Sequence, residues 1–321
     1  MVSHTVARRG ARPGRSTPAL PRRDVSRRRL ARLGWGFSTP ALVMIAAFTI
    51  FPILFSVVLS FENVNVTANG FSLGGATTAN YSLVVGAGLW HHALWFTLLY
   101  TVVTVLVEVI LGTAFALVLE RLTRARGLMM ALLLVPWSMI TVISAELWSY
   151  IYNASYGVID AIATALGLGA PVILGTPVPA TIALMVADIW KTTPFVTIIV
   201  LAGLVMLPSD VFEAAEIDGA SAWTTFWLVT FPLLRPTLAI AVLFRVLQAF
   251  GLFDLPFVLT NGGPGSSTES LAMLGYNTMF QNLDFGPGAA IATSTAVIVL
   301  VLCLIFLRAF KAQVGREEIN A

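Results

Sequence analysis

The 321-residue chain contains little of what a soluble enzyme or a secreted scaffold uses. It has a single cysteine, Cys303, so it can form no internal disulfide and no thiolate metal cluster. Only 11% of its residues are charged, whereas a soluble domain carries about a quarter. Its only lysines are Lys191 and Lys311, and neither follows a glycine, so the chain lacks a phosphate-binding loop ending in Gly-Lys-Ser or Gly-Lys-Thr. These absences exclude the usual kind of ATP site in this polypeptide.

Apolar residues fill most of the chain instead. They make up 57% of it, more than an aqueous fold easily buries, and the length accommodates several spans of roughly 20 residues. The apolar runs predict six membrane-spanning helices, at approximately 36–60, 92–119, 128–152, 178–207, 236–258 and 288–309. We therefore expect an all-α membrane protein in which one six-helix domain occupies 36–310 and a short tail occupies 311–321.

Basic residues lie on one side of this arrangement. Lysine and arginine are absent from the segments 61–91, 153–177 and 259–287. Of the 19 lysines and arginines in the chain, 10 lie in residues 1–35. Because basic segments stay in the cytoplasm, an even number of spans places both termini and the segment 208–236 there. The arm 1–35 is rich in Arg, Pro and Ser, which predicts a disordered cytoplasmic segment. Its charges either serve only to set the topology of the chain or also contact anionic membrane lipid. The net charge of +3 reflects this arm, so we expect no nucleic-acid partner.

A short polar segment separates the fourth and fifth apolar runs. Asp210, with Glu213 three residues later, predicts a capping box at the start of a short helix. Gly219 supplies a left-handed residue that ends this helix. Ser221 predicts the cap of a second short helix, which we expect to end at Pro232. The expected helix, glycine turn and helix suit docking to another protein.

This segment resembles the cytoplasmic coupling loop of binding-protein-dependent ABC importer permeases. The family pattern is Glu-Ala-Ala, three residues, Gly, nine residues, then Ile, any residue, Leu and Pro. The chain matches it with Val229 and Phe231 at the two apolar positions. The resemblance implies that the loop lies in a cleft of a separate ATPase subunit, with coupling residues Glu213, Ala214, Ala215, Asp218, Gly219 and Pro232.

The resemblance extends to the carbohydrate permeases, which include those for maltose, glycerol phosphate and trehalose. It covers roughly residues 36–310 and includes the segments 189–195, 201–204 and 259–264. It implies the type I ABC importer permease fold, a bacterial inner-membrane location, and import of a sugar such as the disaccharide trehalose. It also implies two ATP-binding subunits that hold ATP and Mg²⁺, a second homologous permease and an extracytoplasmic solute-binding protein. This chain itself needs no cofactor.

Charged residues within or beside the apolar runs identify a second candidate site. A charge at the bilayer centre costs about 2.5–3.5 kcal/mol on insertion scales, so it must face a partner or a water-filled cavity. The charges concerned are Glu108, Glu146, Asp188, Lys191, Arg245 and Asp254. In one interpretation they only pair, Asp188 with Lys191 on one helix. Arg245 can likewise pair with Glu146 or Glu108.

The other interpretation is a sugar path. Lys191 is followed by two threonines and the helix-breaking Pro194, and it is preceded by a tryptophan. Such mixtures suit sugars, whose hydroxyls need hydrogen bonds while their C–H faces pack on aromatic rings. The candidate substrate-binding residues are Lys191, Thr192, Thr193, Arg245, Gln248, Phe250 and Asp254.

Two other functions remain open. Lys191 and Arg245 would suit a phosphorylated or other non-sugar solute. An ion-coupled secondary carrier would instead use Glu108, Glu146 and Asp188 as proton or cation sites, and it would work without an ATPase.

Overall fold

The computed structural model describes residues 24–67, 70–122, 124–167, 169 and 171–320. Residues 1–23 of the predicted disordered arm 1–35 therefore lie outside the described residues. Contacts divide the chain into one unit that ends at Leu54 and another that begins at Phe55, and each is described by itself.

The first unit is helical where it is described. It contains α1 (Asp24–Ile45), the π-helical turn η1 (Ala46–Ile50) and the first residues of α2 (Phe51–Ser60). Helix α1 begins inside the segment for which disorder is predicted, because residues 24–35 combine the helix formers Arg, Leu and Ala with no proline. The continuous helix Arg32–Ser60 is long and apolar enough to cross a membrane, as expected for the first span.

Where it is described, the second unit consists of helices and one small sheet. Its elements are β1 (Glu62–Thr67), β2 (Gly70–Ala76), α3 (Ala79–Gly86), α4 (Gly88–Arg121), α5 (Arg126–Ser138), α6 (Thr141–Tyr152), α7 (Val158–Ala165), η2 (Ile173–Gly175), α8 (Pro177–Val205), α9 (Ser209–Ile217), α10 (Ala222–Thr225), η3 (Phe226–Thr230), α11 (Phe231–Phe250), α12 (Asp254–Leu259), α13 (Leu271–Tyr276), η4 (Asn277–Gln281) and α14 (Phe285–Asn320). The all-α expectation is confirmed except for the antiparallel hairpin β1–β2, in which Val64 faces Leu73.

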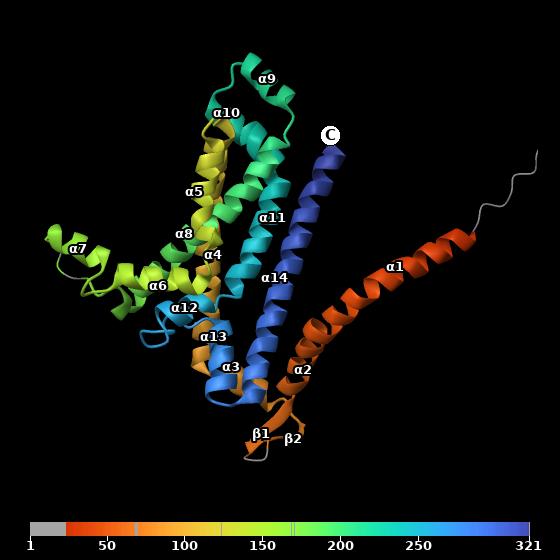
Figure 1. Ribbon diagram of the computed structural model, residues 1–321, viewed down its shortest axis with the longest axis vertical. Coiled ribbons are helices and arrows are strands. Elements are labelled where there is room, and N and C mark those ends of the chain that lie inside the picture. The colour runs from red at the N-terminus through yellow and green to blue at the C-terminus, as the bar shows by residue number, and fades with distance from the viewer. Residues whose placement is uncertain (1–23, 68–69, 123, 168, 170, 321) are drawn as a thin grey trace, which may run out of the picture. The chain divides into compact units, whose positions relative to one another are not determined.

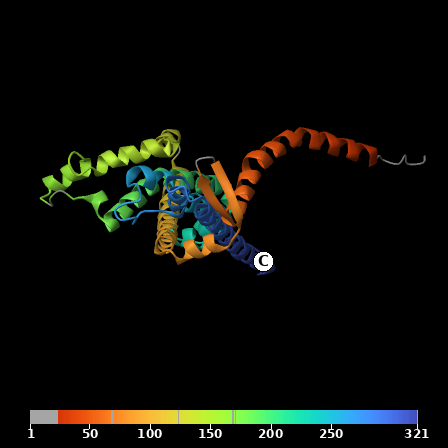
Figure 2. The ribbon, with the colours of Figure 1, turned by 90° about the horizontal axis from the view of Figure 1, so that it is seen from below.

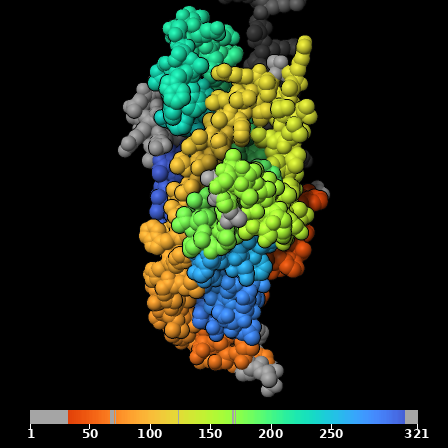
Figure 3. Space-filling view, turned by 90° about the vertical axis from the view of Figure 1, so that its left-hand side faces the viewer, coloured from red at the N-terminus to blue at the C-terminus, as the bar shows by residue number. Residues whose placement is uncertain are grey.

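The long helices of this unit lie side by side. Helix α4 packs on α8, and α11 packs on α4, α8 and α14. We call residues 206–230, which connect α8 to α11, the docking segment. In Figure 1 this segment, with α9 and α10, lies at one end of this unit, together with the last turns of α14. The hairpin and α3 lie at the opposite end. Figure 3 shows the same separation, because α9 and α10 form the top of that face and the hairpin region forms its base.

Among the described residues, five helices are long and apolar enough to cross a membrane, and a bent pair makes a sixth candidate. The five are Arg32–Ser60, Gly88–Arg121, Pro177–Val205, Ala222–Phe250 and Phe285–Phe310. This count agrees with the predicted six spans. Two of the predicted spans differ from the structure: the third is bent, and the fifth has other bounds.

The third predicted span is not one straight helix. Helices α5 and α6 meet at 91°, with Met139 and Ile140 in extended conformation between them. Pro136 in the last turn of α5 has no backbone N–H, which weakens the hydrogen bonding at this point. Figure 2 shows α6 and α7 extending sideways from the other helices of the unit.

The predicted bounds of the fifth span, 236–258, both lie too far toward the C-terminus. The helix runs from Ala222 through η3 to Phe250, so the expectation that it ends at Pro232 is wrong. The π-helical turn η3 widens the backbone just before the proline, and this accommodates the ring in the first turn of α11. Residues 254–258, which the prediction includes in the same span, belong to the separate helix α12 (Asp254–Leu259).

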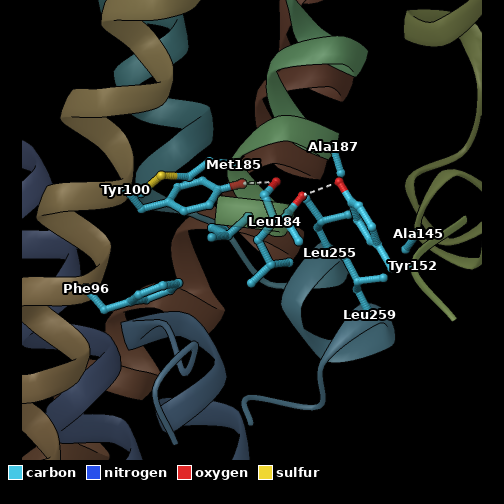
Figure 4. Packing of buried hydrophobic residues seen from close by; sticks show 11 residues of the cluster. Phe96, Tyr100, Ala145, Tyr152, Leu184, Met185, Ala187, Leu255 and Leu259 are labelled. Carbon is cyan, nitrogen blue, oxygen red and sulfur yellow. Dashed lines mark hydrogen bonds between the residues drawn. The ribbon is translucent and has the colours of Figure 1, made fainter. Parts of the chain in front are cut away.

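One hydrophobic core joins α4, α6, α8 and α12. Its buried side chains include Phe96, Tyr100, Tyr152, Leu184 and Leu255. Figure 4 shows the hydroxyl groups of both tyrosines directed at α8, where Tyr100 Oη donates to Leu184 O at 3.4 Å and Tyr152 Oη donates to Ala183 O at 3.1 Å. These bonds satisfy two polar groups that burial would otherwise leave unpaired. They also attach α4 and α6 to the same turn of α8.

Glycines allow the closest approaches between the long helices. A Cβ atom on Gly112 of α4 would lie 2.7 Å from Val196 Cγ1 on α8, and one on Gly203 would lie 2.6 Å from Thr237 Oγ1 on α11. Such distances are too short for van der Waals contact. Small residues of this kind let membrane helices pack backbone to backbone.

We expect Gly203→Val to separate α8 from α11 and to destabilise the protein by roughly 1–3 kcal/mol, as overpacking does. The measurement is thermal unfolding of the detergent-solubilised protein. Gly127→Val is the matched control, because a Cβ at this helical glycine meets nothing within 4 Å. Equal melting temperatures for the two variants would contradict the close approach.

Candidate functional site

A group of charged and polar side chains, buried except for Gln248, joins α4, α8 and α11. We call it the arginine cluster, and it comprises Arg245, Glu108, Asp188, Thr192 and Gln248. The Arg245 guanidinium donates from Nε to Glu108 Oε2 at 2.5 Å and from Nη2 to Glu108 Oε1 at 2.8 Å. Its Nη2 also donates to Asp188 Oδ2 at 3.2 Å, and its Nη1 donates to Gln248 Oε1 at 2.9 Å. One cation therefore holds groups from all three helices.

Burial explains why this cation has so many partners. Arg245 is 2% exposed and Glu108 is fully buried, so water cannot compensate either charge. The planar guanidinium donates two parallel hydrogen bonds to the Glu108 carboxylate, which is the strongest geometry for such a pair. The Thr192 hydroxyl, one turn from Asp188, lies 2.6 Å from Glu108 Oε1 and adds a bond to the same carboxylate.

The structure decides between the pairings that the sequence left open. Arg245 binds Glu108, one of the two partners expected from the sequence, whereas Glu146 lies exposed on α6 and takes no part. The predicted pair of Asp188 with Lys191 is wrong, because Asp188 is bound to Arg245 instead. The Arg245 guanidinium reaches Asp188 from the facing helix, where both groups are shielded from water.

The other predicted substrate residues divide into buried and accessible ones. The Thr193 hydroxyl is buried and donates to Ile189 O at 2.6 Å, and Phe250 is buried among α4, α13 and α14 side chains. Gln248 and Asp254 are exposed, and Lys191 is half-buried. Among the described residues, Lys191 makes no hydrogen bond or salt bridge, although it lies within electrostatic range of Asp188, Arg245 and Asp254.

Two aromatic rings lie beside the accessible polar groups. The rings of Phe195 on α8 and Phe244 on α11 meet edge to face at 6.3 Å between centroids. Lys191 precedes Phe195 by one helical turn, and Gln248 follows Phe244 by one turn. Since α8 and α11 run antiparallel, both polar residues lie on the same side of the aromatic pair, about 6 Å along the helix axes.

This arrangement presents hydrogen-bond donors above a pair of rings. Sequence reasoning did not include Phe195 and Phe244 among the candidates. The signal was available, because each ring is four residues from a polar candidate on the same helix and therefore shares its face.

The docking segment forms the predicted helix, glycine turn and helix. Helix α9 ends in a turn in which Gly219 has φ = +71°. Ala220 N donates to Ala215 O at 3.0 Å and Gly219 N donates to Glu216 O at 3.0 Å, which is the double hydrogen bond of a Schellman motif. Ser221 caps α10, since its Oγ accepts from Thr224 N at 3.2 Å. Both of these predictions are confirmed.

The predicted capping box at the start of α9 is wrong. The helix begins at Ser209 with Pro208 at the cap position, and no side chain caps it. Pro208 has a φ fixed by its ring, which places the chain ready to enter the helix. Asp210 therefore lies inside the first turn, where its carboxylate still favours the positive end of the helix dipole.

The docking segment exposes both acidic and large apolar side chains. Among the predicted coupling residues, Glu213, Ala214, Asp218 and Gly219 are exposed, Ala215 is buried, and Pro232 is half-buried. Large apolar side chains that sequence reasoning did not single out also face outward here. They are Met206, Ile217, Trp223 and Leu228, with exposed fractions of 84%, 86%, 72% and 72%. Exposed apolar patches beside charges mark surfaces that bind another protein.

We expect Glu108→Ala to destabilise the protein by about 3–5 kcal/mol, because it leaves the buried Arg245 charge without its main partner. Glu146→Ala is the control, since this carboxylate is exposed and lies outside the cluster. Thermal unfolding and yield of the detergent-solubilised protein measure both effects. A melting temperature for Glu108→Ala equal to that of Glu146→Ala would show that the cluster does not brace the helices.

The chain matches known proteins along nearly its whole length. Residues 25–316 match the family described as "Binding-protein-dependent transport system inner membrane component". The trehalose/maltose transport system permease protein MalF of Thermococcus litoralis is 39% identical over 282 residues, which cover 87% of this chain and 94% of the relative. The trehalose transport system permease protein SugA of Mycobacterium tuberculosis is 35% identical over 306 residues, which cover 95% of this chain and 97% of the relative.

Solved structures share the fold. A chain from a bacterial ABC transporter involved in the import of the acidic polysaccharide alginate superposes with a TM-score of 0.78 at 19% identity, covering 89% of this chain and 98% of that chain. A chain of the alginate transporter in complex with an alginate pentasaccharide-bound periplasmic protein gives 0.76 at 19%, covering 88% of this chain and 94% of that chain. The chain therefore belongs to the binding-protein-dependent transport system inner membrane components, the permease subunits of ABC importers, in which a separate subunit hydrolyses ATP.

Proposed function

We propose that the chain forms half of the translocation path of an ATP-driven sugar importer, with a disaccharide such as trehalose as its cargo. The relatives named for trehalose and maltose transport support this choice of substrate. The observation that carries the proposal is the docking segment: a short helix closed by a Schellman turn, with acidic and apolar side chains exposed, at one end of the two helices α8 and α11.

The face of α8 and α11 that carries Lys191, Gln248 and the rings of Phe195 and Phe244 supports a sugar path. Lys191 and Gln248 belong to membrane-spanning helices and are not buried, and polar groups of this kind are costly in contact with lipid. They therefore face a path between this chain and a second, homologous permease. Sugar hydroxyls suit the polar groups, and sugar C–H faces suit the rings.

The docking segment supports the coupling to ATP. Two ATP-binding subunits hold ATP and Mg²⁺, and α9 lies in a cleft of one of them on the cytoplasmic side. Closure of the ATPase pair moves the segment, and the helices attached to it follow as a rigid body. The opposite end, with the hairpin β1–β2 and α3, faces the extracytoplasmic solute-binding protein.

One observation favours a second candidate cargo. Lys191 is an accessible cation without a hydrogen-bonded partner among the described residues, so a phosphorylated or otherwise anionic solute would also fit. The ion-coupled carrier has less support, since Glu108 and Asp188 are bound to Arg245 and Glu146 lies apart on α6.

The test is uptake by the complete complex reconstituted in liposomes with its solute-binding protein. We expect radiolabelled trehalose to enter only when ATP is present on the side of the ATPase subunits. An ion gradient alone should give no uptake. Uptake driven by a proton or sodium gradient without ATP would contradict the proposal and favour the secondary carrier.

In the same assay, Glu213→Lys should reduce trehalose uptake at least about tenfold, equivalent to roughly 1.4 kcal/mol of lost coupling. The variant reverses a charge on the exposed face of α9 but removes no buried contact. Glu120→Lys is the control, because it reverses an exposed charge at the end of α4, outside the docking segment. Unchanged uptake by Glu213→Lys would show that α9 does not couple transport to the ATPase.

A further inference from the structure

The arginine cluster contains one member that reaches the accessible face. Gln248 is exposed, whereas Arg245, to which it is bonded, is 2% exposed. The two residues are three apart on α11, so they occupy adjacent turns of one face. Gln248 is therefore the point at which the buried cluster meets the proposed sugar path.

The bond to Arg245 determines which way the Gln248 amide points. An arginine side chain has only N–H donors and no acceptor, so the amide atom that faces Nη1 at 2.9 Å must be the oxygen. The amide NH₂ group is then directed away from Arg245. A glutamine without such a partner can rotate its amide by half a turn and offer either the oxygen or the nitrogen.

Arg245 is itself held in one position. Its Nε and Nη2 atoms are bound to Glu108, and Nη2 also reaches Asp188. Both carboxylates are on other helices, so the guanidinium plane is fixed by α4 and α8 rather than by α11 alone. The orientation of the Gln248 amide therefore depends on the packing of all three helices.

We infer that Gln248 is a substrate-contacting residue that acts only as a hydrogen-bond donor, and that Arg245 is the positioning residue that fixes its amide. The two N–H groups of the Gln248 amide donate hydrogen bonds to hydroxyl oxygens of the sugar when the sugar passes the rings of Phe195 and Phe244. Because the amide is oriented before the sugar arrives, binding does not have to order it. Arg245 itself does not touch the sugar. The inference rests on the proposed function and adds a residue-level mechanism to it.

A double-mutant cycle tests the inference in the reconstituted complex, with the KM for radiolabelled trehalose as the readout. Gln248→Met keeps the length of the side chain but removes both donors, and we expect KM to rise roughly five- to tenfold, the value of one good hydrogen bond. Arg245→Lys keeps the positive charge but replaces three nitrogen atoms by one, so a nitrogen that pairs with Glu108 leaves no donor at the position of Nη1 beside Gln248. In the Arg245→Lys background, Gln248→Met should raise KM by less than about twofold, because the amide is no longer oriented. A Gln248→Met effect that is equally large in both backgrounds would overturn the positioning role.

If the Arg245→Lys protein does not assemble into the complex, a single substitution at the exposed Gln248 provides a second measurement. Gln248→Glu keeps the acceptor for Arg245 Nη1 and nearly the same shape, but it has no N–H donor. We expect its KM to rise about as much as that of Gln248→Met. Gln281→Glu, an exposed glutamine in η4 away from the cluster, controls for the added charge and should leave KM unchanged. A Gln248→Glu protein with the KM of the unmodified protein would overturn the donor role.

The outcomes separate this inference from the function on which it rests. A complex that imports trehalose with ATP but fails the cycle leaves the proposed function intact and overturns only the roles of Gln248 and Arg245. A complex that imports neither trehalose nor maltose overturns the proposed function and this inference together.

Discussion

The buried charge of Arg245 is the constraint on which the rest of this structure depends. A cation that is 2% exposed inside a membrane protein must be matched by acceptors from the protein, and the two carboxylates that bind it lie on two other helices. Glu108 and Asp188 therefore fix the rotation of α4 and α8 relative to α11. With the rotations fixed, the glycine contacts at Gly112 and Gly203 bring the helices close together.

The same pairing connects the two functional regions. The docking segment connects helices α8 and α11. These helices are joined by Asp188 with Arg245 farther from the docking segment and by Gly203 with Thr237 nearer to it. In the proposed function, a force on α9 therefore moves both helices together rather than bending one. The proposed movement also shifts the polar face with Lys191 and Gln248 relative to the proposed second permease, because this face belongs to the same two helices.

The sequence predicted the features that depend on local chemistry and on strong patterns. The apolar runs located the spanning helices, and Gly219 and Ser221 defined the turn and cap of the docking segment, because these residues act within a few positions. The sequence did not predict the 91° bend after Pro136 or the continuation of the helix through Pro232, since a proline in a helix either breaks it or is accommodated according to its surroundings. Nor did it predict Arg245 as the partner of Asp188, because the rotation of one helix relative to another is a tertiary property.

The most direct test of the account concerns the side of the membrane on which α9 lies, since an ATPase can reach it only from the cytoplasm. In a Cys303→Ser background, Ala214→Cys places one thiol on the exposed surface of α9, and Asn63→Cys places one on the hairpin at the opposite end of the same unit. The account predicts that a membrane-impermeant maleimide labels the hairpin thiol in spheroplasts with a sealed inner membrane. The α9 thiol should react only after that membrane is opened. Labelling of the α9 thiol in sealed spheroplasts would contradict it.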